Sequence, residues 1–240
     1  YFVAKYNGSN GALIWIQKYT TTYVNQMNEN CVLDIDKLNN IYVGGSFITD
    51  FTQGSTTITT TTIGTPFISK INQNGVVQWL KKDTLTNAKN LRALSVDKNG
   101  NILIGGFCFV SKFNNTGTEL WSLRLPSSGT SYTTVNGAVT DKNDKSTIVT
   151  ALGTYDIYPN KDTVKVNQLN CTAISLDSSE NRYIVGSFTG NLAFGNYILS
   201  SYAYQNNTDI FVAAYTPNWK TLWAQTVKES DGNDNSNAID

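Results

Sequence analysis

The sequence predicts an all-β fold built from repeated four-stranded antiparallel units, and two recurring segments predict it. The first is a Phe-led strand pattern that is followed 12 or 13 residues later by a tryptophan. The second is an Asp-x-x-x-Asn turn that leads into an apolar run containing glycine. One such unit cannot bury its apolar faces alone, so the repeats must pack on one another.

The Asp-x-x-x-Asn turn joins the first and second strands of each unit. We expect these strands over 32–36 and 41–47, 93–97 and 102–107, and 173–177 and 183–188. Asp and Asn side chains bond nearby backbone groups and tolerate positive φ, which suits a tight reversal. A glycine recurs in the second strand, at Gly45, Gly106 and Gly186, and we expect it to permit close approach between neighbouring units.

The Phe-led pattern supplies the third strand and the tryptophan marks the fourth. The leading residues are Phe2, Phe67, Phe109 and Phe211, and the tryptophans are Trp15, Trp79, Trp121 and Trp223. Asn-rich turns ending in Gly75 and Gly117 join two of these strand pairs, and we expect the indoles to pack between units. The unit at 141–170 lacks both the glycine and the tryptophan, and we expect its last two strands near 155–158 and 162–167.

The spacing of the repeats indicates the architecture. The marker aspartates lie 36 to 63 residues apart, which is typical of the four-stranded blades of a β-propeller. We expect about five blades' worth of strands in a single domain over 1–240, as part of a six- or seven-bladed ring. By this pattern the chain is a fragment that begins at the third strand of one blade and ends after the first strand of another. Two long insertions, 48–66 and 189–210, are expected on the same face of the ring.

Several segments resemble the SBBP-type family of seven-bladed β-propeller repeats. The similarity runs from Gly186-Ser-Phe-Thr-Gly190 through Ala193-Phe-Gly195 and Asp209-Ile-Phe-Val-Ala-Ala-Tyr215 to Leu222-Trp-Ala224, and it covers nearly all of the chain except 141–170. The resemblance implies the propeller fold. It also implies a setting in secreted, surface-attached or viral proteins, and it supplies no catalytic residues.

Composition excludes several classes of function. Eighteen basic and eighteen acidic residues cancel, so no global field favours nucleic acid or an anionic membrane, and no apolar run could be inserted into a bilayer. The chain has no histidine, which excludes Ser-His-Asp and Cys-His catalysis and histidine-ligated metals. We expect Cys31, Cys108 and Cys171 to be unpaired structural thiols.

Candidate binding residues lie in the insertions and in the links between units. They are the tyrosines Tyr197, Tyr202, Tyr204, Tyr23 and Tyr132. Exposed aromatic rings beside Asn and Thr suit stacking on sugars or contact with a protein. Phe51 and Phe194 hold matching positions in the insertions, and we expect them to anchor each insertion to its own unit. The Thr-rich run 56–62 is expected to form an extra exposed hairpin.

Calcium is the one cofactor that the sequence raises. Asp97, Asn99 and Asn101 place oxygen atoms at alternate positions, as calcium loops do, but the later acidic ligand is missing. A hydrogen-bonded turn is the interpretation we favour, so no cofactor is expected.

The sequence therefore predicts a non-enzymatic, structural or adhesive module of a cell surface, a secreted assembly or a virus particle. It would contact protein or glycan through the face bearing 48–66 and 189–210. Self-assembly through the ring edge or that face is a further expectation, and a cytoplasmic location stays open. Two alternatives remain. One is a lyase or glycosidase using carboxylates and tyrosines at the central channel, and the other is a calcium-stabilised architectural repeat.

Overall fold

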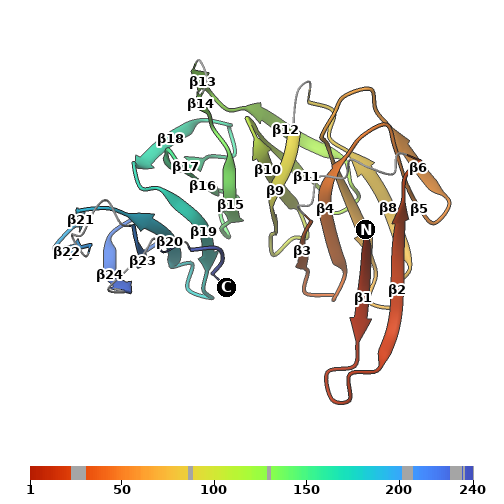
Figure 1. Ribbon diagram of the computed structural model, residues 1–240, viewed down its shortest axis with the longest axis horizontal. Helices are drawn as coiled ribbons and strands as arrows, with labels where there is room; N and C mark the ends of the chain where they lie inside the picture. Colours follow the sequence, from red (N-terminus) through yellow and green to blue (C-terminus); the bar gives the residue numbers. More distant parts are fainter. Residues whose placement is uncertain are drawn as a thin grey trace. The chain divides into compact units, whose positions relative to one another are not determined.

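The structure is a computed structural model that describes residues 1–22, 31–85, 89–128, 131–201, 208–227, 234 and 236–239. Within these residues the strands form five four-stranded antiparallel sheets and two short two-stranded ones (Figure 1). The chain divides into two compact units, Tyr1–Tyr132 and Thr133–Asp240, and each is described by itself. None of the described segments forms a helix long and apolar enough to cross a membrane.

The first unit contains two complete repeats in the predicted strand order. One consists of β3 (Val32–Ile35), β4 (Ile41–Phe47), β7 (Thr65–Ile71) and β8 (Val77–Lys82). The other consists of β9 (Lys89–Val96), β10 (Ile102–Phe107), β11 (Phe109–Phe113) and β12 (Glu119–Arg124). A short pair, β13 (Ser127–Ser128) and β14 (Ser131–Tyr132), follows. The all-β, repeated four-stranded architecture is therefore confirmed.

The third sheet of this unit combines parts of two repeats. It contains β1 (Phe2–Tyr6), β2 (Leu13–Thr20), β5 (Asp50–Gln53) and β6 (Thr56–Thr59). The first two are the Phe and Trp strands of one repeat, whereas β5 and β6 form the insertion of the next. Tyr19 pairs with Gln53 and Thr20 with Thr52, which joins the insertion to the preceding repeat. The predicted extra hairpin is present, but it begins at residue 50 and lies in a sheet.

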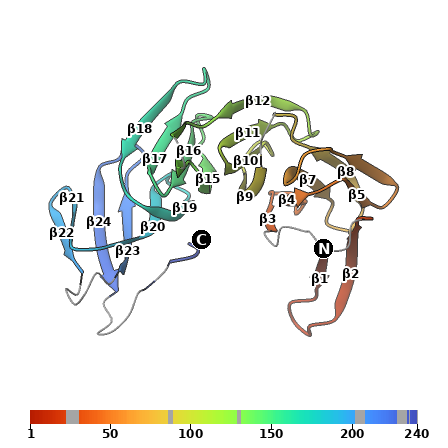
Figure 2. The same cartoon turned by 45° about the horizontal axis from the view of Figure 1, so that its top comes forward.

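The second unit holds two further repeats, shown in green to blue in Figure 2. The first consists of β15 (Val135–Thr140), β16 (Ser146–Thr150), β17 (Gly153–Ile157) and β18 (Thr163–Asn167). The second consists of β19 (Cys171–Leu176), β20 (Arg182–Phe188), β23 (Asp209–Tyr215) and β24 (Thr221–Val227). Its insertion forms the hairpin β21 (Asn191–Phe194) and β22 (Tyr197–Ser200). The shortened repeat at 141–170 thus retains four strands.

Tryptophans join neighbouring repeats in the first unit, as predicted. The indole Nε1 of Trp15 donates to the backbone oxygen of Gln73 at 3.1 Å, and that of Trp79 donates to the oxygen of Asn115 at 3.3 Å. Both acceptors lie in the turn between the third and fourth strands of the next repeat. A Cβ on Gly75 would lie 2.7 Å from the Trp15 ring, and this glycine also has a φ of 82°. The turn therefore needs glycine, both for its conformation and for room beside the indole.

In the second unit the tryptophan at the contact between repeats belongs to the later repeat of the pair. Trp219 occupies the turn position that Gly75 holds in its own repeat, with a φ of 62°. Its Nε1 donates at 2.9 Å to Asp156, in the repeat that has no tryptophan of its own. The guanidinium of Arg182 lies 5.2 Å from the Trp219 ring centre. An indole thus joins the two repeats here too, but it comes from a turn of the later repeat rather than from the fourth strand of the earlier one.

The glycines of the second strand have a different neighbour from the one expected. A Cβ on Gly186 would lie 2.1 Å from the backbone oxygen of Asn170, and one on Gly106 would lie 2.5 Å from that of Asn90. Asn90 lies in β9, the first strand of the repeat that contains Gly106, and Asn170 directly precedes β19, the first strand of the repeat that contains Gly186. The prediction of a close approach between repeats is therefore wrong for these two glycines, whose close neighbours belong to their own repeat.

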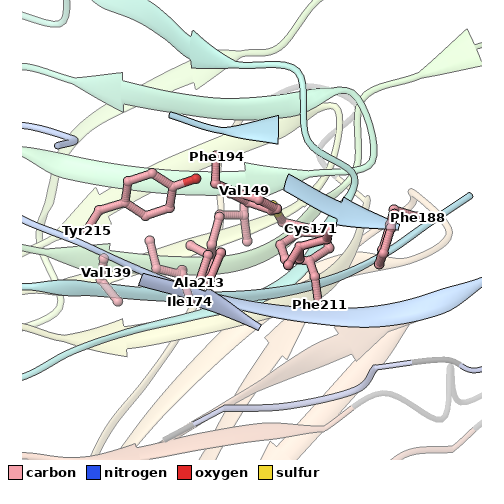
Figure 3. Packing of buried hydrophobic residues seen from close by; sticks show 12 residues of the cluster. Val139, Val149, Cys171, Ile174, Phe188, Phe194, Phe211, Ala213 and Tyr215 are labelled. Carbon is pink, nitrogen blue, oxygen red and sulfur yellow. The ribbon is translucent and has the colours of Figure 1, made fainter. Parts of the chain in front are cut away.

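Aromatic and aliphatic side chains fill the interior of each unit. Figure 3 shows the cluster of the second unit, in which Val139 and Val149 meet side chains of the last repeat. Cys171 and Phe211 are fully buried in this cluster. All three cysteines of the sequence are described, and none forms a disulfide.

Candidate binding surface

The hairpin β21–β22 is anchored to its repeat by Phe194. This side chain is buried, and its ring centre lies 5.2 Å from that of Phe211 and 6.4 Å from that of Tyr215. Leu199 of the facing strand is buried in the same cluster. Figure 3 shows Phe194 above Phe211 in this cluster. The prediction that Phe194 anchors the insertion to its own repeat is confirmed.

The hairpin exposes two large apolar side chains, one on each face. Ile198, on the face opposite Phe194, is 72 % exposed; Tyr197, which pairs with Phe194 and so shares its face, is also exposed, as is Leu222 of β24. The Tyr197 hydroxyl donates to the backbone oxygen of Leu222 at 2.7 Å, which fixes the ring against β24. Since that hydroxyl already has an acceptor, what the tyrosine offers a partner is chiefly its ring. Tyr197, Ile198 and Leu222 are called the hairpin patch below.

The other predicted tyrosines are less informative. Tyr23, Tyr202 and Tyr204 lie outside the described residues. Tyr132 ends β14, where its backbone pairs with Ser127. Tyr197 is therefore the predicted binding residue that the structure places on a defined surface, and its role there remains a prediction.

The hairpin β5–β6 has the same kind of anchor but a different surface. Phe51 is fully buried, with its ring centre 4.2 Å from that of Phe67 in its own repeat and 5.2 Å from that of Tyr19 in the preceding one. Its exposed side chains are hydroxyl-bearing ones, those of Ser55, Thr56, Thr57 and Thr59. This insertion is anchored as predicted, and it presents hydroxyl groups rather than an apolar surface.

The suggested calcium ligands form a closed turn. Asp97 Oδ1 accepts from the backbone nitrogens of Asn99 at 2.8 Å and Asn101 at 2.9 Å, and Oδ2 accepts from the Asn101 side chain at 3.0 Å. The ammonium of Lys112, which is buried, lies 3.7 Å from Oδ2. Donors therefore already surround the carboxylate, and a positive charge stands beside it. The geometry fits a turn better than a cation site.

The same carboxylate geometry recurs in the other repeats. Asp177 accepts from the backbone and side chain of Asn181 and from the hydroxyl of Tyr183. These hydrogen bonds, the one from the Asn181 side chain first, hold the pKa of Asp177 below its ordinary value. In Asp36, burial would raise the pKa, but hydrogen bonds from Asn40 and its neighbours lower it. The repeated Asp is a structural element of the turn.

Charged side chains in the second unit also serve contacts between repeats. Arg182 is fully buried; its guanidinium donates to Asp141 at 3.2 Å and to the backbone oxygen of Pro217 at 2.9 Å. Within the first repeat of this unit, Lys145 pairs with Asp156 at 3.0 Å. Among the described residues, no group of three or more Cys, Asp or Glu side chains is placed to hold a metal ion. These ion pairs provide no vacant catalytic acid or base.

One buried carboxylate was not foreseen. Asp83 follows the tryptophan of its repeat by four residues and is buried, and its Oδ2 has no hydrogen-bond partner within the described structure. Burial raises the pKa of this carboxyl above its ordinary value, and the nearby Ser111 hydroxyl offsets that increase in part. The matching residue one repeat earlier is Tyr19, which is also buried. The sequence signal that could have indicated this buried group is a polar residue four places after the tryptophan.

No protein-family model matches the sequence, and no curated protein matches it. Solved structures do match. A protein of unknown function from Bacteroides caccae matches 94 % of this chain over 90 % of its own, with 11 % identity and a TM-score of 0.51. A catalytically inactive virginiamycin B lyase from Staphylococcus aureus, solved with quinupristin, matches 93 % of this chain over 78 % of its own, with 10 % identity and a TM-score of 0.51. At these identities the likeness concerns the fold, which is that of β-propeller proteins over most of the chain.

Proposed function

We propose that the chain is a non-enzymatic SBBP-type β-propeller repeat module that binds a protein partner through the hairpin patch. The observation that carries this proposal is the exposure of three apolar side chains, Tyr197 and Ile198 of a hairpin fixed by the buried Phe194 and Leu222 of the adjoining β24. Exposed apolar residues on a pre-ordered element favour association, because little conformational entropy is lost when the partner binds. A protein surface suits this patch better than a glycan, since Ile198 and Leu222 are aliphatic and offer no hydrogen bonds to sugar hydroxyls.

The absence of histidine supports a role without catalysis. The Staphylococcus lyase described as catalytically inactive is a histidine-to-alanine variant, and this chain has no histidine to supply such a group. The described carboxylates that we have followed are bound in turns and ion pairs, apart from the one buried Asp83 oxygen. A location on a cell surface, in a secreted assembly or on a virus particle belongs to the same proposal. It is supported by the repeat resemblance and by the charged fraction of 15 %.

Site-specific photo-crosslinking tests the binding role. A photoreactive phenylalanine replaces Ile198 in one protein and Leu120, an exposed apolar residue of β12, in the matched control. Each protein is irradiated with the surface fraction of its source. We expect one adduct specific to position 198, which unlabelled chain prevents from forming and the I198E chain does not. The same adducts at both positions, or equal competition by I198E, would contradict the proposal.

A separate assay tests the absence of catalysis. Quinupristin is incubated with the purified chain and followed by liquid chromatography with tandem mass spectrometry, which also detects a product isomer of unchanged mass, and we expect it to remain unconverted. Conversion of quinupristin at a rate proportional to the concentration of the chain would show that the non-enzymatic proposal is wrong.

A further inference from the structure

Four asparagines stand in the pattern Asn-x-Ser/Thr, which is the acceptor pattern of N-linked glycosylation. They are Asn7, Asn114, Asn170 and Asn206. Asn206 lies outside the described residues. Because the chain is rich in asparagine and threonine, the pattern also arises by coincidence, and the surroundings of each side chain have to distinguish an acceptor from a chance match.

Asn114 begins the turn between β11 and β12, and its amide oxygen is held in place. Oδ1 accepts from the hydroxyl of Thr116 at 2.7 Å, from the backbone nitrogen of Thr116 at 3.0 Å and from that of Thr118 at 2.9 Å. Three donors around one atom identify it as the oxygen of the amide. The nitrogen Nδ2 has no hydrogen-bond partner within the described structure, and the residue is partly exposed. The amide nitrogen is therefore accessible while the oxygen is fixed.

This arrangement suits the transfer of a sugar to Nδ2. The transfer forms a bond between Nδ2 and the first carbon of the sugar, and it breaks the bond from that carbon to the phosphate of a lipid diphosphate carrier. One Nδ2 proton passes to a base of the transferase. An amide nitrogen is a weak nucleophile, because its lone pair is shared with the carbonyl. The Thr116 hydroxyl donates to Oδ1 and stabilises the negative charge that gathers there as the proton leaves.

The turn is held by local bonds and leaves the acceptor free in the folded chain. The backbone nitrogen of Gly117 donates to the oxygen of Asn114 at 2.9 Å, and the nitrogen of Asn114 donates to the oxygen of Thr118 at 2.9 Å. Such a turn can form before the rest of the repeat folds, when a transferase meets the emerging chain. In the folded chain the next residue makes the contact with the preceding repeat, since the oxygen of Asn115 accepts from Trp79. A glycan on Nδ2 leaves that bond in place.

Two turns at the same repeat position provide comparisons. At Asn7 the Ser9 hydroxyl donates to Oδ1 at 2.6 Å and the Ser9 backbone nitrogen at 2.9 Å, so the arrangement recurs. At Asn72 the amide oxygen accepts from the backbone nitrogens of Asn74 and Val76, but no hydroxyl is present two residues on. The turn around Asn72 thus has the same backbone bonds without the acceptor pattern.

Asn170 has the pattern without the geometry. The hydroxyl of Thr172 donates to the backbone oxygen of Val185 at 3.3 Å and lies 2.6 Å from the hydroxyl oxygen of Ser236. Both partners are distant along the chain, and neither bond directs the hydroxyl to the amide of Asn170. We therefore expect a difference between Asn114 and Asn170 that the sequence pattern alone does not predict.

We infer that Asn114 is the acceptor of an N-linked glycan, transferred from an oligosaccharide on a lipid diphosphate. The inference rests on the secreted or surface location in the proposed function, because this transfer occurs in proteins that enter the secretory pathway. The glycan would cover the turn between β11 and β12 with a bulky hydrophilic group.

Secretion of the chain from a eukaryotic cell line, behind a cleavable signal sequence, tests the inference. The purified product is treated with peptide-N-glycosidase in water enriched in the heavy oxygen isotope, which converts each occupied asparagine to a labelled aspartate. Tandem mass spectrometry then locates the label. We expect it at Asn114 in most molecules and at Asn7, with little at Asn170. The same chain made without the signal sequence should carry no label, which controls for spontaneous deamidation.

Three variants separate the acceptor geometry from general accessibility. T116A should abolish the label at Asn114, whereas T116S, which keeps the hydroxyl, should retain it. N74T supplies the missing hydroxyl in the matched turn and should create a label at Asn72. Circular dichroism confirms that each secreted variant is folded.

An unlabelled Asn114 in the folded, secreted chain would overturn the inference, as would more label at Asn170 than at Asn114. The chain isolated from its source should carry the same label. Its absence there, with label in the recombinant chain, would show that the location is wrong and would overturn the inference through that premise. The photo-crosslink at position 198 requires no glycan, so its loss would contradict the binding role alone.

Discussion

Replacing Phe194 with alanine should loosen the hairpin on which the proposed binding patch lies. The change removes a buried ring and its contacts with Phe211 and Tyr215, at 5.2 and 6.4 Å between ring centres. Phe-to-Ala substitutions at buried sites cost about 3–5 kcal/mol. Because the hairpin lies on the outside of its sheet and can settle partly into the gap, we expect about 3 kcal/mol. Urea unfolding monitored by tryptophan fluorescence measures the loss.

A matched variant on the same hairpin separates anchoring from surface contact. I198A changes a side chain that is 72 % exposed, so the free energy of unfolding should change by less than about 0.5 kcal/mol. Hydrogen exchange of the amides of β21 and β22 should accelerate in F194A and remain unchanged in I198A. A loss below about 1 kcal/mol in F194A, with the hairpin amides still protected, would refute the anchoring argument.

The remaining predictions concern buried polar groups, glycines and turns. Burial raises the folded-state pKa of Asp83, so between the ordinary and the raised value the folded chain binds more protons and stability falls as the pH rises. D83N should therefore have the higher melting temperature at neutral pH and lose that advantage in acid, and a lower melting temperature at neutral pH would contradict this. G186A should cost about 2 kcal/mol or more, because its Cβ would meet a backbone oxygen, whereas G8A, with nothing within 4 Å, should be neutral in urea unfolding. W219F should cost about 1–2 kcal/mol through loss of the bond to Asp156 and the ring contact with arginine, and an unchanged unfolding midpoint would refute that assignment. Calcium should leave the melting temperature unchanged, since turn donors already occupy the carboxylates, and a concentration-dependent rise would contradict this.

Most of the fold could be predicted from local sequence patterns. The Asp-x-x-x-Asn turn predicts a reversal because the aspartate bonds backbone groups within four residues, as Asp97 does with Asn99 and Asn101. The anchoring role of Phe51 and Phe194 was predictable from their matching positions in the two insertions. In each case the information lies in a short stretch of sequence.

Features that depend on two repeats at once were not predictable in this way. The pairing of β5 with β2 requires a partner strand more than thirty residues away. At the contact made by Trp219, the indole comes from a turn instead of a fourth strand. The sequence did contain a signal of this, since tryptophan holds the turn position where two other repeats have glycine. It becomes meaningful only once the contact between Trp15 and Gly75 is known.

The same reasoning applies to the candidate site. Sequence position suggested Tyr197, but the exposure of Ile198 follows from the pairing of β21 with β22, which points Ile198 away from the face of the buried Phe194. The burial of Asp83 likewise depends on the neighbouring repeat.

The account rests on the equivalence of residues in successive repeats, and residue-resolved hydrogen exchange of the isolated chain tests it most directly. Strand β7 pairs on both sides, whereas β1 has one free edge. We predict that alternate amides of β1 exchange rapidly and that those of β7 are protected throughout. Protection of every β1 amide equal to that of β7, in the chain alone, would contradict the account.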